Sequence, residues 1–146
     1  MLEGPGVMAG GFDFAEYLNR LPVVAYETAL DATYTLRYVS AEAVKMLGYP
    51  PELFLGDGST YTPASVVHPA DLSLVDKGAE LQVSGVDFIV SRFRLIHASG
   101  AEVPVLDIAR TLRHADGSVR GSAGVFIDLR KLPMLQGPPA ILYSGE

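Results

Sequence analysis

The chain has 146 residues, of which 49% are hydrophobic and 19% charged, and this balance indicates one globular domain rather than a disordered chain. Its net charge of −6 argues against a broad nucleic-acid surface, because phosphate binding needs clustered Lys and Arg side chains. The chain has no cysteine, which excludes disulfides, thiol chemistry and cysteine-based metal sites.

Residues 1–11 are rich in glycine and carry Glu3, so they lack the basic start and long apolar middle of a secretory signal. We interpret them as a flexible leader. No stretch approaches the roughly 20 consecutive apolar residues of a membrane span. We therefore expect a cytoplasmic domain without membrane insertion.

Residues 12–21 are predicted to form a short amphipathic helix that ends before Pro22. Its apolar side chains recur at i, i+3, i+4 and i+7, so they share one helix face; they are Phe14, Tyr17, Leu18 and Leu21. Because this face needs cover, we expect the helix to form a homodimer contact or to pack on its own sheet.

Two strands are predicted next, over residues 23–30 and 34–39, and a short turn joins them as a hairpin. A helix follows over residues 40–47 and ends at Gly48, a residue typical of helix C-termini. Residues 50–63 are broken by Pro and Gly, which predicts short turns. Pro69 then begins a helix that continues to about residue 83.

Three long strands are predicted over residues 86–97, 102–113 and 118–128, with turn signals at Ser99-Gly100 and Asp116-Gly117. Helices that lie between two groups of hairpin-linked strands predict an antiparallel α+β domain. The remaining residues, 131–146, contain several prolines, and we interpret them as a Pro-rich tail or linker.

Four segments occur in an order and spacing found together in one known family. They are residues 36–56 (LRYVSAEAVKMLGYPPELFLG), 66–75 (VVHPADLSLV), 92–107 (RFRLIHASGAEVPVLD) and 114–129 (HADGSVRGSAGVFIDL). Together they resemble the PAS domain, in particular the subgroup found in bacterial sensor kinases and cyclic-di-nucleotide enzymes.

The resemblance implies a PAS-like five-stranded antiparallel sheet that cups a small pocket, with short helices on one face and an N-terminal helix. The domain would span residues 12–130, with its core at residues 22–130. Such domains bind a small molecule or a partner protein and signal to an attached or separate effector, such as a kinase or cyclase. The family's cofactors include flavins or chromophores linked to cysteine, which this chain excludes. Haem is a minor alternative, and the resemblance leaves the ligand unknown.

Seven polar side chains are candidates for the pocket, and they are Tyr26, Tyr38, Tyr61, His68, Arg92, Arg94 and Asp107. The resemblance places His68 where haem-binding relatives supply a ligand, although a capping role before Pro69 is the favoured interpretation. The two arginines share one strand face and point either to a bound anion or to solvent. Asp107 is expected either to pair with one of these arginines across the sheet or to line the pocket.

No metal site is predicted, because His97 and His114 lie at opposite ends of the strand pair. The leading hypothesis is a sensor module of a signalling system, such as a two-component system, that binds a small molecule noncovalently. The alternative is a ligand-free module for dimerisation or partner docking. A small α+β enzyme with Asp107 as its base is the least favoured hypothesis, and we predict no enzymatic activity.

Overall fold

The computed structural model describes Gly6 and residues 9–146, so most of the predicted leader lies outside the described residues. The strands are β1 (Val23–Thr28), β2 (Leu36–Val39), β3 (Phe88–Ile96), β4 (Glu102–Arg113), β5 (Val119–Asp128) and β6 (Ala140–Gly145). The helices are α1 (Phe14–Leu18), α2 (Ala43–Leu47), α3 (Pro63–Val66) and α4 (Leu72–Val83). Single 3₁₀ turns occur at Pro51–Leu53, Pro69–Asp71, Leu129–Lys131 and Pro133–Leu135. No helix in this described part is long and apolar enough to cross a membrane.

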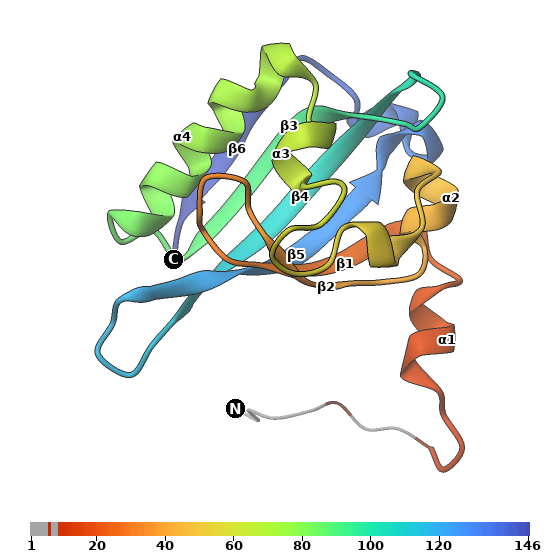
Figure 1. Cartoon of the computed structure of the whole chain (residues 1–146), viewed down its shortest axis with the longest axis horizontal. Coiled ribbons are helices and arrows are strands. Elements are labelled where there is room, and N and C mark those ends of the chain that lie inside the picture. The colour runs from red at the N-terminus through yellow and green to blue at the C-terminus, as the bar shows by residue number, and fades with distance from the viewer. Residues whose placement is uncertain (1–5, 7–8) are drawn as a thin grey trace.

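All six strands form one antiparallel sheet in the order β2-β1-β5-β4-β3-β6 (Figure 1). The central pairs β1–β5, β5–β4 and β4–β3 extend along nearly the full length of their strands. Along β1 and β3, successive side chains alternate between buried and half-buried, as expected for strands with one covered face. The predicted antiparallel α+β fold is therefore confirmed.

The strand count differs from the predicted five, because Ala140–Gly145 adds a sixth strand that pairs with β3. These residues belong to the segment predicted to be a tail or linker. The prolines that suggested a linker end at Pro139, so every later residue keeps the N–H that strand pairing requires. Strand β6 covers an edge of β3 that would otherwise be left unpaired.

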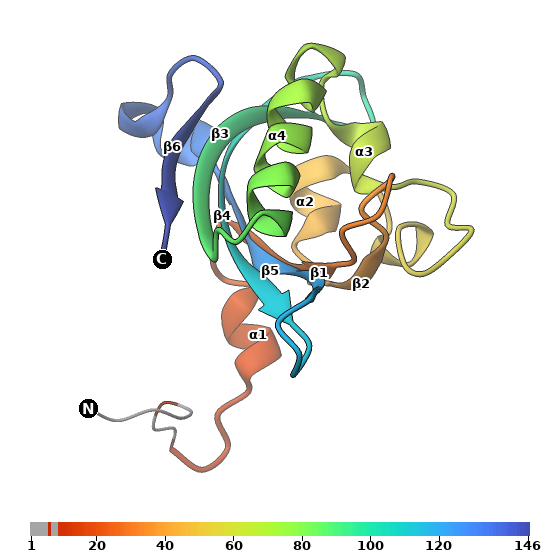
Figure 2. The same cartoon turned by 90° about the vertical axis from the view of Figure 1, so that its left-hand side faces the viewer.

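The helices α2, α3 and α4 lie on one face of the sheet, and β3 and β4 curve around α4 (Figure 2). The core lies between this face and the helices. Its most deeply buried side chains come mainly from the strands, and they include Val24, Leu95, Val103 and Val105.

Helix α1 is shorter than predicted and projects away from the sheet (Figures 1 and 2). The Asp13 side chain accepts a hydrogen bond from the backbone N–H of Glu16 and so caps the helix. Phe14 and Tyr17 are 58% and 42% exposed, whereas Leu18 and Leu21 are half-buried. The aromatic half of the predicted apolar face is therefore left uncovered, whereas the leucine half is partly covered.

Candidate ligand pocket

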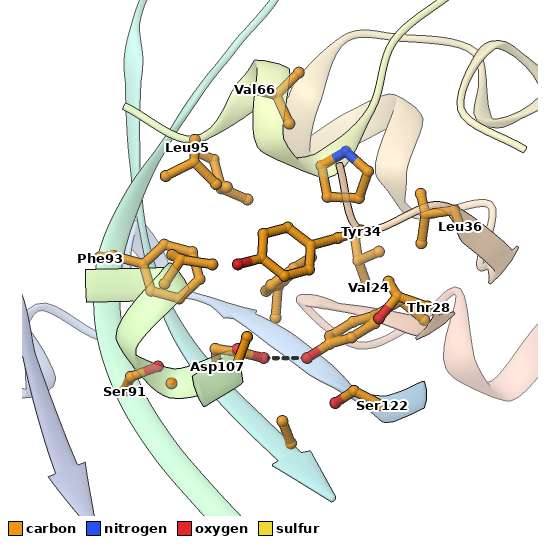
Figure 3. A pocket seen from close by; sticks show the side chains of 18 of the residues that line it. Val24, Thr28, Tyr34, Leu36, Val66, Ser91, Phe93, Leu95, Asp107 and Ser122 are labelled. Carbon is orange, nitrogen blue, oxygen red and sulfur yellow. Dashed lines mark hydrogen bonds between the residues drawn. The ribbon is translucent and has the colours of Figure 1, made fainter. Parts of the chain in front are cut away.

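A cavity of about 90 Å³ lies between the inner face of the sheet and helix α4. Its walls are predominantly apolar, with Val24, Phe93 and Leu95 contributed by the strands (Figure 3). Val75 and Gly78 close it from α4. A cavity with such walls excludes bulk water from the groups that line it and therefore strengthens electrostatic interactions inside.

The polar end of the cavity is formed by Tyr26 of β1 and Asp107 of β4. The Tyr26 hydroxyl donates a hydrogen bond to Asp107 Oδ1 at 2.6 Å, the dashed line in Figure 3. Tyr26 also stacks on Phe126, with 4.5 Å between ring centroids. The stacking fixes the direction in which the phenol points, and therefore positions its hydroxyl on the carboxyl group.

Burial raises the pKa of Asp107 to about 7, and the hydrogen bond from Tyr26 opposes part of that rise. The pKa of Tyr26 is raised well above its ordinary value by burial and then by the neighbouring Asp107 charge. Tyr26 therefore remains a neutral donor near neutral pH, whereas Asp107 changes its charge there.

Two further polar side chains, Gln82 and Ser122, are buried near Tyr26. The Gln82 amide on α4 donates a hydrogen bond to Ser122 Oγ on β5 at 3.1 Å. Ser122 also lies close enough to Tyr26 to lower the pKa of its phenol. Polar side chains from β1, β4, β5 and α4 therefore lie together at this end of the cavity.

Tyr34 lines the cavity from the turn before β2, and sequence analysis missed it (Figure 3). Its φ of 57° lies in the left-handed region, which is uncommon for a bulky residue. The strand consequently begins at Leu36 and not at the predicted residue 34. Asp31 accepts hydrogen bonds from the backbone N–H of Thr33 and of Thr35 and so stabilises this turn. The Tyr34 hydroxyl reaches α4 and donates to Asp76.

Of the seven predicted pocket residues, only Tyr26 and Asp107 line the cavity. Tyr38 is exposed on β2. Tyr61 packs outside the cavity lining, against Tyr49 and Phe54, with ring centroids 4.5 and 5.7 Å away. Neither tyrosine therefore lines the cavity, although Tyr61 packs against the lining residue Phe54.

The two arginines lie on the opposite face of the sheet from Asp107, so of the two alternatives for Asp107 the cross-strand ion pair is wrong. In the β3–β4 register Asp107 lies opposite Ser91, and Arg92 lies opposite Leu106. The reason is the connecting loop, in which the His97 N–H donates to the Ala101 carbonyl and leaves three residues, 98–100, between this pair. A two-residue loop would have placed Asp107 opposite Arg92, because a shift of one residue exchanges the faces.

Each arginine has other partners. Arg94 donates to both carboxylate oxygens of Asp71, at 2.8 and 2.9 Å, and Asp71 is only 3% exposed. Arg92 donates to the backbone carbonyls of Leu135 and Pro138, at 3.2 and 3.0 Å, and so fastens the segment that leads into β6. Neither arginine lines the cavity.

His68 does not line the cavity either. Its Nδ1 accepts a hydrogen bond from the Ala70 N–H at 3.0 Å, so the ring caps the turn that begins at Pro69. His97 bonds to Ser99 beside its own turn. Among the described residues, no group of three His, Asp or Glu side chains is arranged to hold a metal ion.

The geometry agrees with what comparison with known proteins finds. A family model described as PAS fold matches residues 36–126. No curated protein matches the chain significantly. Many solved structures share the fold, and three of them at low sequence identity are described next.

The N-terminal domain of a diguanylate cyclase with PAS/PAC sensor from Marinobacter aquaeolei is 20% identical, with a TM-score of 0.63 over 76% of this chain and 98% of that one. A PAS domain of a protein from Colwellia psychrerythraea is 14% identical, with a TM-score of 0.65 over 80% and 94%. An RNA-binding light-oxygen-voltage receptor is 15% identical, with a TM-score of 0.60 over 90% of this chain and 38% of that one. The cavity under α4, the antiparallel sheet and the family match agree, and the chain belongs to the PAS fold family.

Proposed function

We propose that this domain is a signalling sensor that binds a small molecule noncovalently in the cavity between the sheet and α4. The observation that carries the proposal is an apolar cavity with one polar end, made by Tyr26 and Asp107. Such a combination is typical of ligand sites, in which apolar walls supply affinity and a few polar groups fix orientation. We propose no catalytic role for these groups.

Gly78 supports a cavity that is kept open for a ligand. Glycine inside a helix costs about 1 kcal/mol relative to alanine, yet Gly78 lies near the middle of α4. A Cβ at this position would meet only Ile89 Cδ1, at 3.9 Å, which is ordinary contact. Close packing therefore does not demand glycine here, and its absence of a side chain leaves space in the cavity wall.

Haem does not fit the residues present. The cavity of about 90 Å³ is far smaller than the 300–1,000 Å³, roughly, of sites for larger ligands. No histidine lines it, and His68 uses Nδ1 to cap its own turn. We therefore propose a ligand smaller than the common macrocyclic or nucleotide cofactors.

The substitution Gly78→Ala tests the proposal. We expect a gain of up to about 1 kcal/mol in the free energy of unfolding, because alanine is the better helix former. We also expect weaker binding of whatever small molecule occupies the cavity, because the new methyl group takes part of its volume. Thermal melting and native mass spectrometry of protein purified from cells measure the two effects.

Ser73→Ala is the matched control, because it changes an exposed residue of the same helix away from the cavity. Ser73→Ala should leave the mass of any bound small molecule unchanged in native mass spectrometry. A stabilised Gly78→Ala protein with no bound mass before or after substitution, and no melting response to a metabolite panel, would favour the alternative of a ligand-free interaction module.

We further propose that the domain forms a homodimer through α1. The rings of Phe12 and Phe14 lie 5.6 and 6.4 Å from the ring of Tyr17, so the exposed helix carries one aromatic cluster. Exposed aromatic clusters are favoured at protein interfaces.

The double substitution Phe14→Glu and Tyr17→Glu should convert a dimer to a monomer in sedimentation experiments, with the melting temperature of the core largely retained. Unchanged sedimentation would contradict the α1 contact. A kinase or cyclase effector and a cytoplasmic location, both expected from the sequence, remain predictions.

A further inference from the structure

The charges around the cavity indicate which class of ligand it would take. Asp107 is the only carboxylate among the lining residues, and these residues include no Lys, Arg or His. Arg92 and Arg94 were the expected partners for this charge, but they lie on the opposite face of the sheet and have other partners. The carboxyl group of Asp107 therefore has no cation to neutralise it inside the cavity.

Asp107 also retains unused capacity to accept hydrogen bonds. A carboxylate has about four acceptor positions. Within the described residues, Asp107 Oδ1 accepts one hydrogen bond, from Tyr26, and Oδ2 accepts none. The other polar groups that line the polar end are Ser91 of β3, Ser122 of β5 and Gln82 of α4, and they are neutral.

We propose that the cavity binds a small organic cation with an apolar chain, such as a primary alkylamine, whose ammonium group donates a hydrogen bond to Asp107. This inference rests on the proposed function. A cation would neutralise a charge that is costly to bury, whereas an anion would add a second like charge. The wider surroundings point the same way. Tyr34 at the cavity wall donates to Asp76, and the charges of Asp76 and Glu80 on α4 help to raise the pKa of Tyr34.

The cavity volume limits the size of that ligand. An engineered apolar cavity of about 150 Å³ in another protein binds benzene. The present cavity is smaller, at about 90 Å³, so an alkylamine with about four non-hydrogen atoms is a suitable probe. We choose propylamine, together with propan-1-ol and propanoate, which have the same three-carbon skeleton and differ in the polar end.

The affinity for the amine should rise with pH. The ammonium group, with a pKa of about 10, stays charged, so the titrating partner is Asp107, whose pKa burial raises to about 7. Between pH 6 and pH 8 the ionised fraction of Asp107 grows about tenfold, and the affinity for the amine should grow by a similar factor. Tyr26 and Tyr34 stay neutral over this range because their pKa values are raised.

Titration of the three compounds into ¹⁵N,¹³C-labelled protein, followed by NMR at pH 8, tests the proposal. We expect the amine to bind at least tenfold more tightly than the carboxylate, with shifts at Val24, Phe93 and Leu95. Asp107→Asn should weaken amine binding at least tenfold and leave alcohol binding within about threefold. The alcohol therefore shows that the variant still has a folded, open cavity.

The outcomes separate this inference from the function on which it rests. If the alcohol binds but the amine binds no better than the carboxylate, the amine proposal is wrong and the small-molecule site stands. If the amine binds equally well to Asp107→Asn, the proposed role of Asp107 is wrong. If none of the three compounds shifts a cavity resonance at millimolar concentration, both the amine proposal and the proposed ligand site are contradicted.

Discussion

Asp71 is buried and Asp107 is half-buried at the cavity, and their carboxyl groups differ in their partners. Asp71 lies at the edge of β3, where it accepts hydrogen bonds from the Arg94 guanidinium and from the Arg94 backbone N–H. The hydrogen bonds and charge of Arg94 lower the pKa of Asp71. Asp107 lies in the cavity with one hydrogen bond and no cation, and burial raises its pKa to about 7.

The difference separates a structural carboxylate from one that is available to a ligand. The Asp71–Arg94 pair is complete within the chain, and it joins the turn before α4 to β3. Asp107 would become equally well paired only if a cation entered the cavity. The buried charge that costs stability is therefore the group best suited to recognise a ligand.

Arg94→Leu should give the largest effect, a greater loss in the free energy of unfolding than any other variant below, because it leaves Asp71 buried without its cation. Arg92→Leu, two residues away on the same face, is the control and should cost about 1 kcal/mol. Chemical denaturation at pH 7 measures both. The Arg94→Leu deficit should shrink as the pH falls through the lowered pKa of Asp71, because a protonated Asp71 no longer needs the cation. Equal losses in the two variants would contradict the structural role of the pair.

Asp107→Asn should change the pH dependence of the free energy of unfolding in the opposite direction from Arg94→Leu. The pKa of Asp107 is about 7 in the folded protein and 3.8 as its ordinary value, so the folded state holds a proton that the unfolded state releases between these values. The contribution of Asp107 to stability is therefore present at low pH and is lost as the pH rises through 7. Relative to Asp107→Asn, the natural protein should lose about 2 kcal/mol between pH 5 and pH 8, a figure reduced because the cavity admits some solvent. Parallel pH profiles would contradict a raised pKa.

Tyr26→Phe should produce the smallest change, a loss of about 1 kcal/mol from the missing hydrogen bond. The pKa of Asp107 should rise further, because the Tyr26 hydroxyl stabilises the charged form. Carbon NMR of the carboxyl group follows this shift. A lower pKa of Asp107 in the variant would mean that Tyr26 acts mainly on the neutral acid.

The sequence was sufficient to predict the antiparallel α+β fold, since the turn signals at Ser99-Gly100 and Asp116-Gly117 divide the second half of the chain into three long strands. It did not reveal β6, because prolines in residues 133–139 obscured a strand that needs the exposed edge of β3 as its template. Partner choice across a sheet depends on the three-dimensional assembly more than on local pattern.

The site was predictable only in part, because it too depends on which residues the three-dimensional assembly brings together. Tyr26 and Asp107 were identified because each is a polar side chain among apolar strand residues. The partner of Asp107 was assigned to the wrong face, because one extra loop residue after His97 exchanges the faces. Tyr34 and Gln82 approach the cavity through tertiary packing alone, and their spacing in the sequence carries no signal of that approach.

The central claim is that Asp107 is an unpaired carboxyl group that recognises a cation in the cavity. The most direct measurement is the titration of the Asp107 carboxyl carbon by NMR, with and without saturating propylamine. We predict an apparent pKa of about 7 in the free protein and a clear decrease with the amine, whereas propan-1-ol should not lower it. A carboxyl group that titrates near 4 in the free protein, or whose pKa ignores the amine, would contradict the claim.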